Sequence, residues 1–207
     1  MRFLPVLFAA MACPFASIAA DPNALGEKEI ADGWILLFDG ESMTGWKVDG
    51  EVAVKDGFLV LGGTKATKAF TTASLAEAAV RIEAEWEGQA APSVRTPGKR
   101  VNTEAQKKAY ESSGTAEKPE PILSLDVPEG TRVRLRSAKA RPLGTKPLFD
   151  GKSLAGWKVN EADPKRVASK FEIAKDGELH VTNGPGDLRT EAKFGDFVLQ
   201  LECKTNG

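Results

Sequence analysis

The chain contains the stretch Leu37-Phe-Asp-Gly-Glu-Ser-Met-Thr-Gly-Trp-Lys-Val48 and, 111 residues later, Leu148-Phe-Asp-Gly-Lys-Ser-Leu-Ala-Gly-Trp-Lys-Val159. Nine of the twelve positions are identical, including the tryptophan and both glycines of each stretch. An internal repeat of this kind indicates that one structural unit occurs more than once in a chain. The sequence therefore predicts two tandem copies of one small fold.

Three shorter blocks follow the repeat in both copies. The aligned pairs are 55–59 with 175–179, 70–72 with 188–190, and 80–83 with 199–202. Apolar side chains occupy every second position of the last block, at Phe197, Leu199, Leu201 and Cys203, which is the period of a strand with one face in a core. Asp56-Gly57 and Asp176-Gly177 are hairpin turn signals. We therefore expect an all-β fold built of short antiparallel strands.

Arginines alternate with apolar residues at positions 132–136, around Val133 and Leu135. This pattern predicts a strand with one basic face. A solvated sheet face is the simpler interpretation, and a face turned toward a ligand is the alternative.

The copies have different lengths. The first extends over residues 33–143 and closes with strands from Ile122 to Leu143, and residues 142–147 form a linker. Within it, residues 88–121 are rich in Lys, Glu, Ala, Ser, Thr and Pro, so we expect a loose polar loop there. The second copy extends over 146–207, and we expect it to be only the N-terminal part of a full copy.

Residues 1–20 have the features of a cleaved secretory signal. Arg2 precedes a short apolar run, small residues follow it, and Asp21 begins a polar chain. We expect cleavage at Ala19 or Ala20 and a secreted or periplasmic protein. Lipidation at Cys13 and a buried N-terminal helix are the alternatives. Loss of Cys13 would leave Cys203 without a partner for an intrachain disulfide.

The bulk composition excludes several classes of partner. The formal net charge is −1 in 207 residues, so nothing favours nucleic acid or an anionic membrane. Beyond the N-terminal segment, no apolar run reaches membrane-spanning length. The single histidine, His180, and the two cysteines form no recognisable zinc motif, and we predict no metal and no cofactor.

The repeated block, the later Lys-Asp-Gly-Glu-Leu179, and the run Phe194-Gly-Asp-Phe-Val-Leu-Gln-Leu-Glu202 together resemble the 3-keto-disaccharide hydrolase domain family. The resemblance is good over 146–207 and fair over 33–86. It implies a concanavalin-like jelly-roll β-sandwich, found in exported bacterial proteins. Relative to that pattern the first copy is degenerate, because its middle strands are replaced by polar sequence, and the second is incomplete.

The resemblance also implies a reaction on 3-keto-disaccharides and other 3-keto-glycosides. The ketone acidifies the C2–H bond of the sugar, so a base removes that proton, the aglycone leaves C1, and water adds. This chemistry needs a general base, an acid for the leaving oxygen and an electrophile for the enolate. The catalytic residues are not identified.

The candidate substrate-binding residues are polar side chains near one expected strand of the second copy: Arg189, Gln200, Glu202 and Lys204. We expect His180 on a solvated face, and Trp46, Trp157, Phe38 and Phe149 in packing. Two alternatives to the hydrolase stay open. One is a non-catalytic carbohydrate-binding sandwich, because the fold also serves lectins, and the other is an inactive, degenerate fragment.

Overall fold

The computed structural model of the chain describes residues 21–103, 109–162, 164, 166–195 and 197–205. Contacts between residues divide it into two compact units, Met1–Arg141 and Pro142–Gly207, which we call the first and second unit. The division falls at the start of the predicted linker. The predicted signal peptide, with Cys13, lies outside the described residues. No helix in the described part of the chain is long and apolar enough to cross a membrane.

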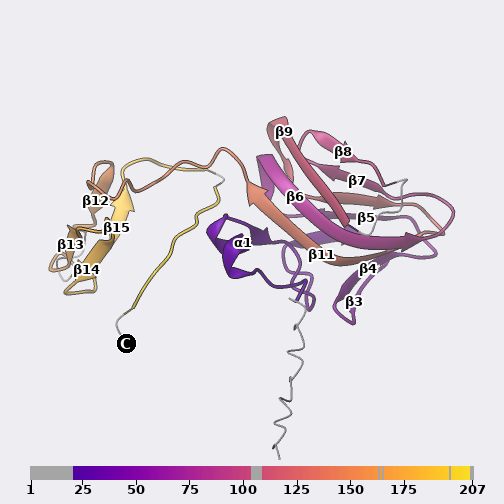
Figure 1. Ribbon diagram of the computed structural model, residues 1–207, viewed down its shortest axis with the longest axis horizontal. Helices are drawn as coiled ribbons and strands as arrows, with labels where there is room; N and C mark the ends of the chain where they lie inside the picture. The colour runs from indigo at the N-terminus through magenta and orange to yellow at the C-terminus, as the bar shows by residue number, and fades with distance from the viewer. Residues whose placement is uncertain (1–20, 104–108, 163, 165, 196, 206–207) are drawn as a thin grey trace, which may run out of the picture. The chain divides into compact units, whose positions relative to one another are not determined.

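The first unit is a sandwich of two antiparallel sheets, preceded by the short helix α1 (Glu27–Ala31). The strands of the larger sheet are β1 (Ile35–Leu36), β3 (Val52–Lys55), β4 (Phe58–Gly62), β6 (Ser74–Glu87), β9 (Ala109–Pro121) and β11 (Arg132–Pro142). Their order is β3-β4-β11-β6-β9, with β1 paired to β11 (Figure 1).

The strands of the smaller sheet are β2 (Trp46–Asp49), β5 (Thr67–Thr71), β7 (Ser93–Thr96), β8 (Lys99–Val101) and β10 (Ser124–Val127). Their order is β2-β5-β10-β7-β8. The predicted all-β sandwich is confirmed, and so is the Asp56-Gly57 hairpin turn, which joins β3 to β4 with both residues at positive φ.

The core lies between the two sheets and is filled by every second side chain of the strands. The larger of them, at 0–3% exposure, are Leu59, Leu61, Val80, Ile82, Leu125, Val127, Val133 and Leu135. Burying a side chain of this size stabilises the fold by roughly 1.5–3 kcal/mol relative to leaving it exposed. The alternation sends the intervening charged residues of β6 and β11 to the outer face of the larger sheet.

The prediction of a loose polar loop at residues 88–121 is wrong. The described part of this stretch contains β7, β8 and β9. Strand pairing depends on backbone hydrogen bonds, which low apolar content does not remove, and β9 lies at the edge of its sheet, where Lys and Glu are common. On its inner side, the hydroxyls of Thr96 and Ser112 share a buried hydrogen bond of 3.0 Å.

The second unit contains four strands in two pairs within its described residues. They are β12 (Trp157–Val159), β13 (Lys170–Ile173), β14 (Leu179–Thr182) and β15 (Leu188–Thr190). β12 pairs with β15 and β13 pairs with β14. The Asp176-Gly177 turn joins β13 to β14 as predicted, but its loop is longer than that of the first unit, because Ile173 is the residue paired with Leu179.

The two tryptophans of the repeat have equivalent strand pairing, which shifts the sequence alignment of one block by one residue. Trp46 pairs with Thr71, and Trp157 pairs with Thr190. Thr71, rather than Thr72, is therefore the equivalent of Thr190. The same offset aligns Val80 with Leu199, as the sequence predicts.

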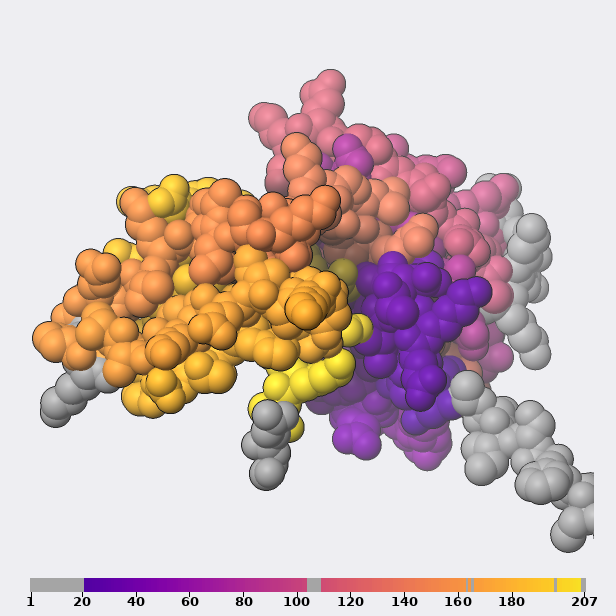
Figure 2. Space-filling view, turned by 60° about the vertical axis from the view of Figure 1, so that its left-hand side comes forward, coloured from indigo at the N-terminus to yellow at the C-terminus, as the bar shows by residue number. Residues whose placement is uncertain are grey.

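The strand predicted around residues 199–202 is wrong for the chain as described. Residues 197–205 have no strand assignment, and they form an extended run at the surface, yellow in Figures 1 and 2. The side chains expected in the core are exposed: Phe197 by 66%, Leu199 by 53%, Leu201 by 67%, and also Cys203. A strand needs a neighbour to accept and donate its backbone hydrogen bonds, and this segment pairs with none of the described strands.

Candidate functional site

The repeated tryptophans have a structural role. Trp46 is 6% exposed, and its indole N–H donates to the carbonyl oxygen of Leu37 at 2.6 Å. Trp157 makes the same bond to Leu148 at 3.2 Å, although it is only half-buried. The prediction that these tryptophans pack, rather than stack on sugars, is confirmed for Trp46. Phe38, at 2% exposure, also lies in the core.

The repeated aspartates hold the loop of the same block. Asp39 accepts hydrogen bonds from the N–H and the hydroxyl of Ser42, at 2.7 Å each, and Asp150 accepts the same two from Ser153 at 2.8 and 3.1 Å. The Ser42 hydroxyl is the main cause that lowers the pKa of Asp39. For Asp150, the backbone N–H of Lys152 is the main cause that lowers the pKa. Both carboxylates are occupied by their loop and have little capacity to act on a ligand.

The outer face of the larger sheet carries two rows of opposite charge. We call the outward residues of β6 and β11 the charged face: Glu83, Glu85, Glu87, Arg132, Arg134 and Arg136. Arg134 pairs with Glu85 at 3.0 Å, and Arg132 pairs with Glu87 at 3.7 Å. Each of these side chains is 44–76% exposed, so the pairs are screened by solvent and remain available to a ligand.

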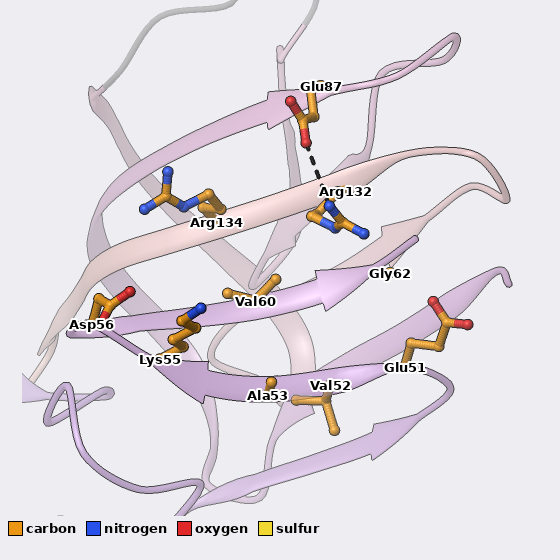
Figure 3. A pocket seen from close by; sticks show the side chains of 10 residues that line it. All are labelled: Glu51, Val52, Ala53, Lys55, Asp56, Val60, Gly62, Glu87, Arg132 and Arg134. Atoms are coloured by element: carbon orange, nitrogen blue, oxygen red, sulfur yellow. Dashed lines mark ion pairs between the residues drawn. The ribbon is translucent and has the colours of Figure 1, made fainter. Parts of the chain in front are cut away.

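A hollow of about 510 Å³ lies at one end of the charged face. Its lining residues come from β3, β4, β6, β11 and their turns: Glu51, Val52, Ala53, Lys55, Asp56, Val60, Gly62, Glu87, Arg132 and Arg134. Figure 3 shows the Lys55 and Arg134 side chains over one end of β4, and Glu51 and Arg132 toward the other. This first hollow is wide, polar and open, which suits a hydroxyl-rich ligand.

Neighbouring groups hold several charged side chains in and beside the first hollow. The guanidinium groups of Arg134 and Arg136 lie over the ring of Phe58, at 4.1 and 5.2 Å from its centroid, which holds them by cation–π attraction. Glu51 accepts hydrogen bonds from the hydroxyl and the N–H of Thr64, and these bonds lower the pKa of Glu51. The first hollow therefore presents positioned charges of both signs.

A second hollow of about 340 Å³ lies toward α1, with Arg81, Glu83, Glu111 and Lys139 among its lining residues. Arg81 pairs with Glu111 at 3.5 Å. Lys139 pairs with Glu29 of α1 at 2.8 Å, and this pair is the less exposed of the two, at 13% and 26%. The Lys139 hydrogen bond is the main cause that lowers the pKa of Glu29.

The predicted binding residues lie in the second unit and do not share a strand face. Arg189 is an exposed residue of β15, paired with Lys158 across the strands. Gln200, Glu202 and Lys204 are exposed residues of the stretch 197–205, which has no strand assignment. Lys204 pairs with Glu178 at 2.8 Å. By the offset that aligns Thr71 with Thr190, Gln200, Glu202 and Lys204 are the sequence counterparts of Arg81, Glu83 and Glu85 on β6.

His180 is exposed on β14, as predicted, with its Nε2 3.6 Å from Glu178. Ligand atoms of Asp176, Glu178 and His180 lie within 4.8 Å of one another, so this group could hold a cation. All three side chains are exposed and Glu178 already pairs with Lys204. Motif reasoning from His and Cys spacing could not find this group, because two of its members are carboxylates.

Only part of the charged face could be predicted from the sequence. The alternation at 132–136 was visible in the sequence. Its significance lies in the matching row of glutamates on β6, which is 45 or more residues away. Only the pairing of β6 with β11 brings the two rows together.

Comparison with known proteins finds a similarity to a known family that is confined to the second unit. Residues 144–207 match the family of 3-keto-alpha-glucoside-1,2-lyase-like domains. The match coincides with the predicted second copy to within two residues at its start. No curated protein matches the chain.

Two solved structures share the sandwich arrangement at low similarity. A candidate glycosyl hydrolase from Parabacteroides distasonis is 14% identical with a TM-score of 0.40, over 58% of this chain and 99% of its own. The exoplasmic/lumenal domain of VIP36, solved with calcium and Man3GlcNAc bound, is 7% identical with a TM-score of 0.34, over 56% of this chain and 90% of its own. Values this low carry no argument about function.

Proposed function

We propose that this protein cleaves 3-keto-glycosides by C2 proton abstraction, elimination and hydration. The observation that carries the proposal is the match of residues 144–207 to the 3-keto-alpha-glucoside-1,2-lyase-like family. The first unit supports it, because it shares the repeated block and the strand pairing of the second unit, and because it bears the larger polar hollow.

A base takes the C2 proton, and the C2–H electron pair forms an enolate whose charge rests on the oxygen at C3. The enolate then re-forms the ketone and the C1=C2 double bond as the bond from C1 to the aglycone oxygen breaks. The aglycone oxygen receives a proton, and water finally adds its oxygen to C1 and a proton returns to C2.

The first hollow offers groups for these roles. Asp56 and Glu87 are its candidate bases, while Glu51 is a weaker base because its hydrogen bonds to Thr64 lower its pKa. Arg132 and Arg134 are candidates to stabilise the enolate oxygen, since an arginine stays charged and offers several directed N–H groups. Lys55 is a candidate acid for the leaving oxygen.

The test is an assay on a 4-nitrophenyl 3-keto-glucoside, with its unoxidised parent glucoside as the matched substrate. We expect nitrophenol release from the ketone only, because the parent lacks an acidified C2–H bond. Turnover in D2O should place deuterium at C2, since that proton is lost and regained. Release without deuterium incorporation would instead indicate direct displacement at C1.

Variants connect the reaction to the hollow. We expect Arg132→Met with Arg134→Met to lower kcat/KM about 10²-fold or more, as loss of a donor to a developing oxyanion does. The matched control is Arg95→Met, an exposed arginine of the smaller sheet that pairs with Asp126 at 3.8 Å. Equal activity of both variants would remove the first hollow from the mechanism.

A second candidate function is carbohydrate binding without catalysis. The observation in its favour is that Glu87 is paired with Arg132, and that hydrogen bonds lower the pKa of Glu51. The Glu51 carboxylate, whose pKa is lowered, accepts hydrogen bonds from sugar hydroxyls well and is a weak base for taking the C2 proton. Calorimetric binding of the 3-keto-glucoside without any turnover would favour this function.

We also propose that the protein is exported after cleavage of residues 1–20. N-terminal sequencing of the secreted or periplasmic protein should begin at Ala20 or Asp21. Retention of Met1, or a lipid on Cys13, would contradict the proposal.

A further inference from the structure

The two hollows lie on one face of one sheet. Outward positions of β6 alternate along the strand, so Arg81 and Glu83 at the second hollow face the same side as Glu87 at the first. On β11 the first hollow is lined by Arg132 and Arg134 and the second by Lys139, farther along the strand. The larger sheet thus carries one outer surface with a depression toward each end.

The distance between the hollows sets the length of a ligand that fills both. Six residue steps separate Arg81 from Glu87, which is about 20 Å along an extended strand. A single sugar ring spans only a fraction of that length. The middle of the surface is also suited to a ligand, because Glu85 lies on β6 between the two hollows, and Arg136 of β11 lies over the ring of Phe58.

The charges of the hollows indicate which class of ligand fits. Three cations and three carboxylates line the first hollow, and two cations and three carboxylates line the second. Because the positive and negative charges of each hollow nearly balance, neither an acidic nor a basic ligand is attracted preferentially. A hydroxyl group both donates and accepts hydrogen bonds, so a neutral sugar chain can use the cations and the carboxylates together.

We propose that this surface binds a neutral oligosaccharide longer than a disaccharide, with the second hollow as a distal subsite for the rings beyond the cleaved bond. The inference rests on the proposed function, which assigns the reacting ring to the first hollow. Glu83 and Glu111, which line the second hollow from β6 and β9, would accept hydrogen bonds from the distal rings.

The test compares 3-keto-maltose with 3-keto-maltotetraose, each oxidised at C3 of the non-reducing ring, so that the leaving sugar differs only in length. We expect the unaltered protein to show a kcat/KM about tenfold higher for the tetrasaccharide, as additional hydrogen bonds to charged groups would give. In the double variant Glu83→Gln with Glu111→Gln, that gain should disappear while the value for 3-keto-maltose is unchanged. Asp126→Asn, on the smaller sheet, is the matched control and should retain the gain.

The outcomes separate the two proposals. Turnover of both sugars with equal kcat/KM in the unaltered protein would overturn the distal subsite and leave the proposed function intact. A gain that survives in the double variant would place the distal rings elsewhere and also overturn it. Absence of turnover for either sugar would contradict the proposed function, and the inference with it.

Discussion

Trp46 and Trp157 occupy the same position in the two copies of the repeat and have the same local contacts. Each indole N–H donates a hydrogen bond to the carbonyl oxygen of the leucine nine residues earlier. Each tryptophan is paired with a threonine of the neighbouring strand. Gly45 and Gly156, the residues before them, have φ values of 82° and 81°. Yet the first tryptophan is buried and the second is not.

The same difference recurs in the segment that follows. Val80 and Ile82 of β6 are 0% and 3% exposed, whereas their counterparts Leu199 and Leu201 are 53% and 67% exposed. β6 lies between β11 and β9, and no described strand flanks the second-unit segment. A short motif can therefore form the same hydrogen bonds in both units. Its burial depends on strands from other parts of the fold.

Replacement of each tryptophan by alanine should give the largest difference in the free energy of unfolding between the two units. We expect Trp46→Ala to lower the free energy of unfolding by about 3–5 kcal/mol, because it empties a packed core site. Trp157→Ala should lower it by less than half as much, since the side chain is only half-buried. Urea unfolding followed by far-UV circular dichroism measures both, and equal losses would contradict the difference in packing.

The next largest difference in stability is expected between β6 and the corresponding segment of the second unit, whose side chains are exposed. Ile82→Ala should destabilise by about 2–5 kcal/mol. Leu201→Ala should change stability by no more than about 0.5 kcal/mol, as at other exposed sites. The same unfolding experiment applies to both variants. A large loss for Leu201→Ala would mean that this side chain is covered in solution.

Equal effects are expected where the local geometry is equal. Gly45 and Gly156 both have positive φ, and an added Cβ would meet nothing within 4 Å at either. Gly45→Ala and Gly156→Ala should therefore each cost roughly 1–2 kcal/mol from backbone strain alone. Gly195→Ala, at an open site without positive φ, is the control and should cost little. Unequal losses for the first two would show that the two loops differ.

The smallest expected difference is between the pKa values of Asp39 and Asp150. Because the pKa of each is lowered on folding, each carboxylate stabilises the fold above its unfolded pKa. That contribution is lost as the pH falls through the folded pKa. Ser42→Ala should raise the pKa of Asp39, and Ser153→Ala should raise that of Asp150 by less, because the main cause there is a backbone N–H.

Carboxyl titration by NMR measures both pKa values in each variant. The unaltered protein is the reference, and each serine variant serves as the control for the aspartate of the other unit. A larger rise at Asp150 than at Asp39 would contradict the assigned causes.

Features that arise within a few neighbouring residues could be predicted from the sequence. The hairpin turns at Asp56-Gly57 and Asp176-Gly177 are confirmed, and so is the alternation that buries Val133 and Leu135. These features depend on backbone preferences and on side chains close together in the chain. For the same reason the all-β class could be predicted without knowing which strands pair.

The remaining features depend on contacts between residues far apart in the chain, which form only in the tertiary structure. It turned the polar stretch at 88–121 into strands, because β9 gains backbone hydrogen bonds from β6 that no local composition reveals. It left Leu199 and Leu201 exposed, because alternation predicts a strand but cannot supply its neighbours. It also placed Glu87 beside Arg132 on the charged face, since a site shared by two strands exists only once those strands are paired.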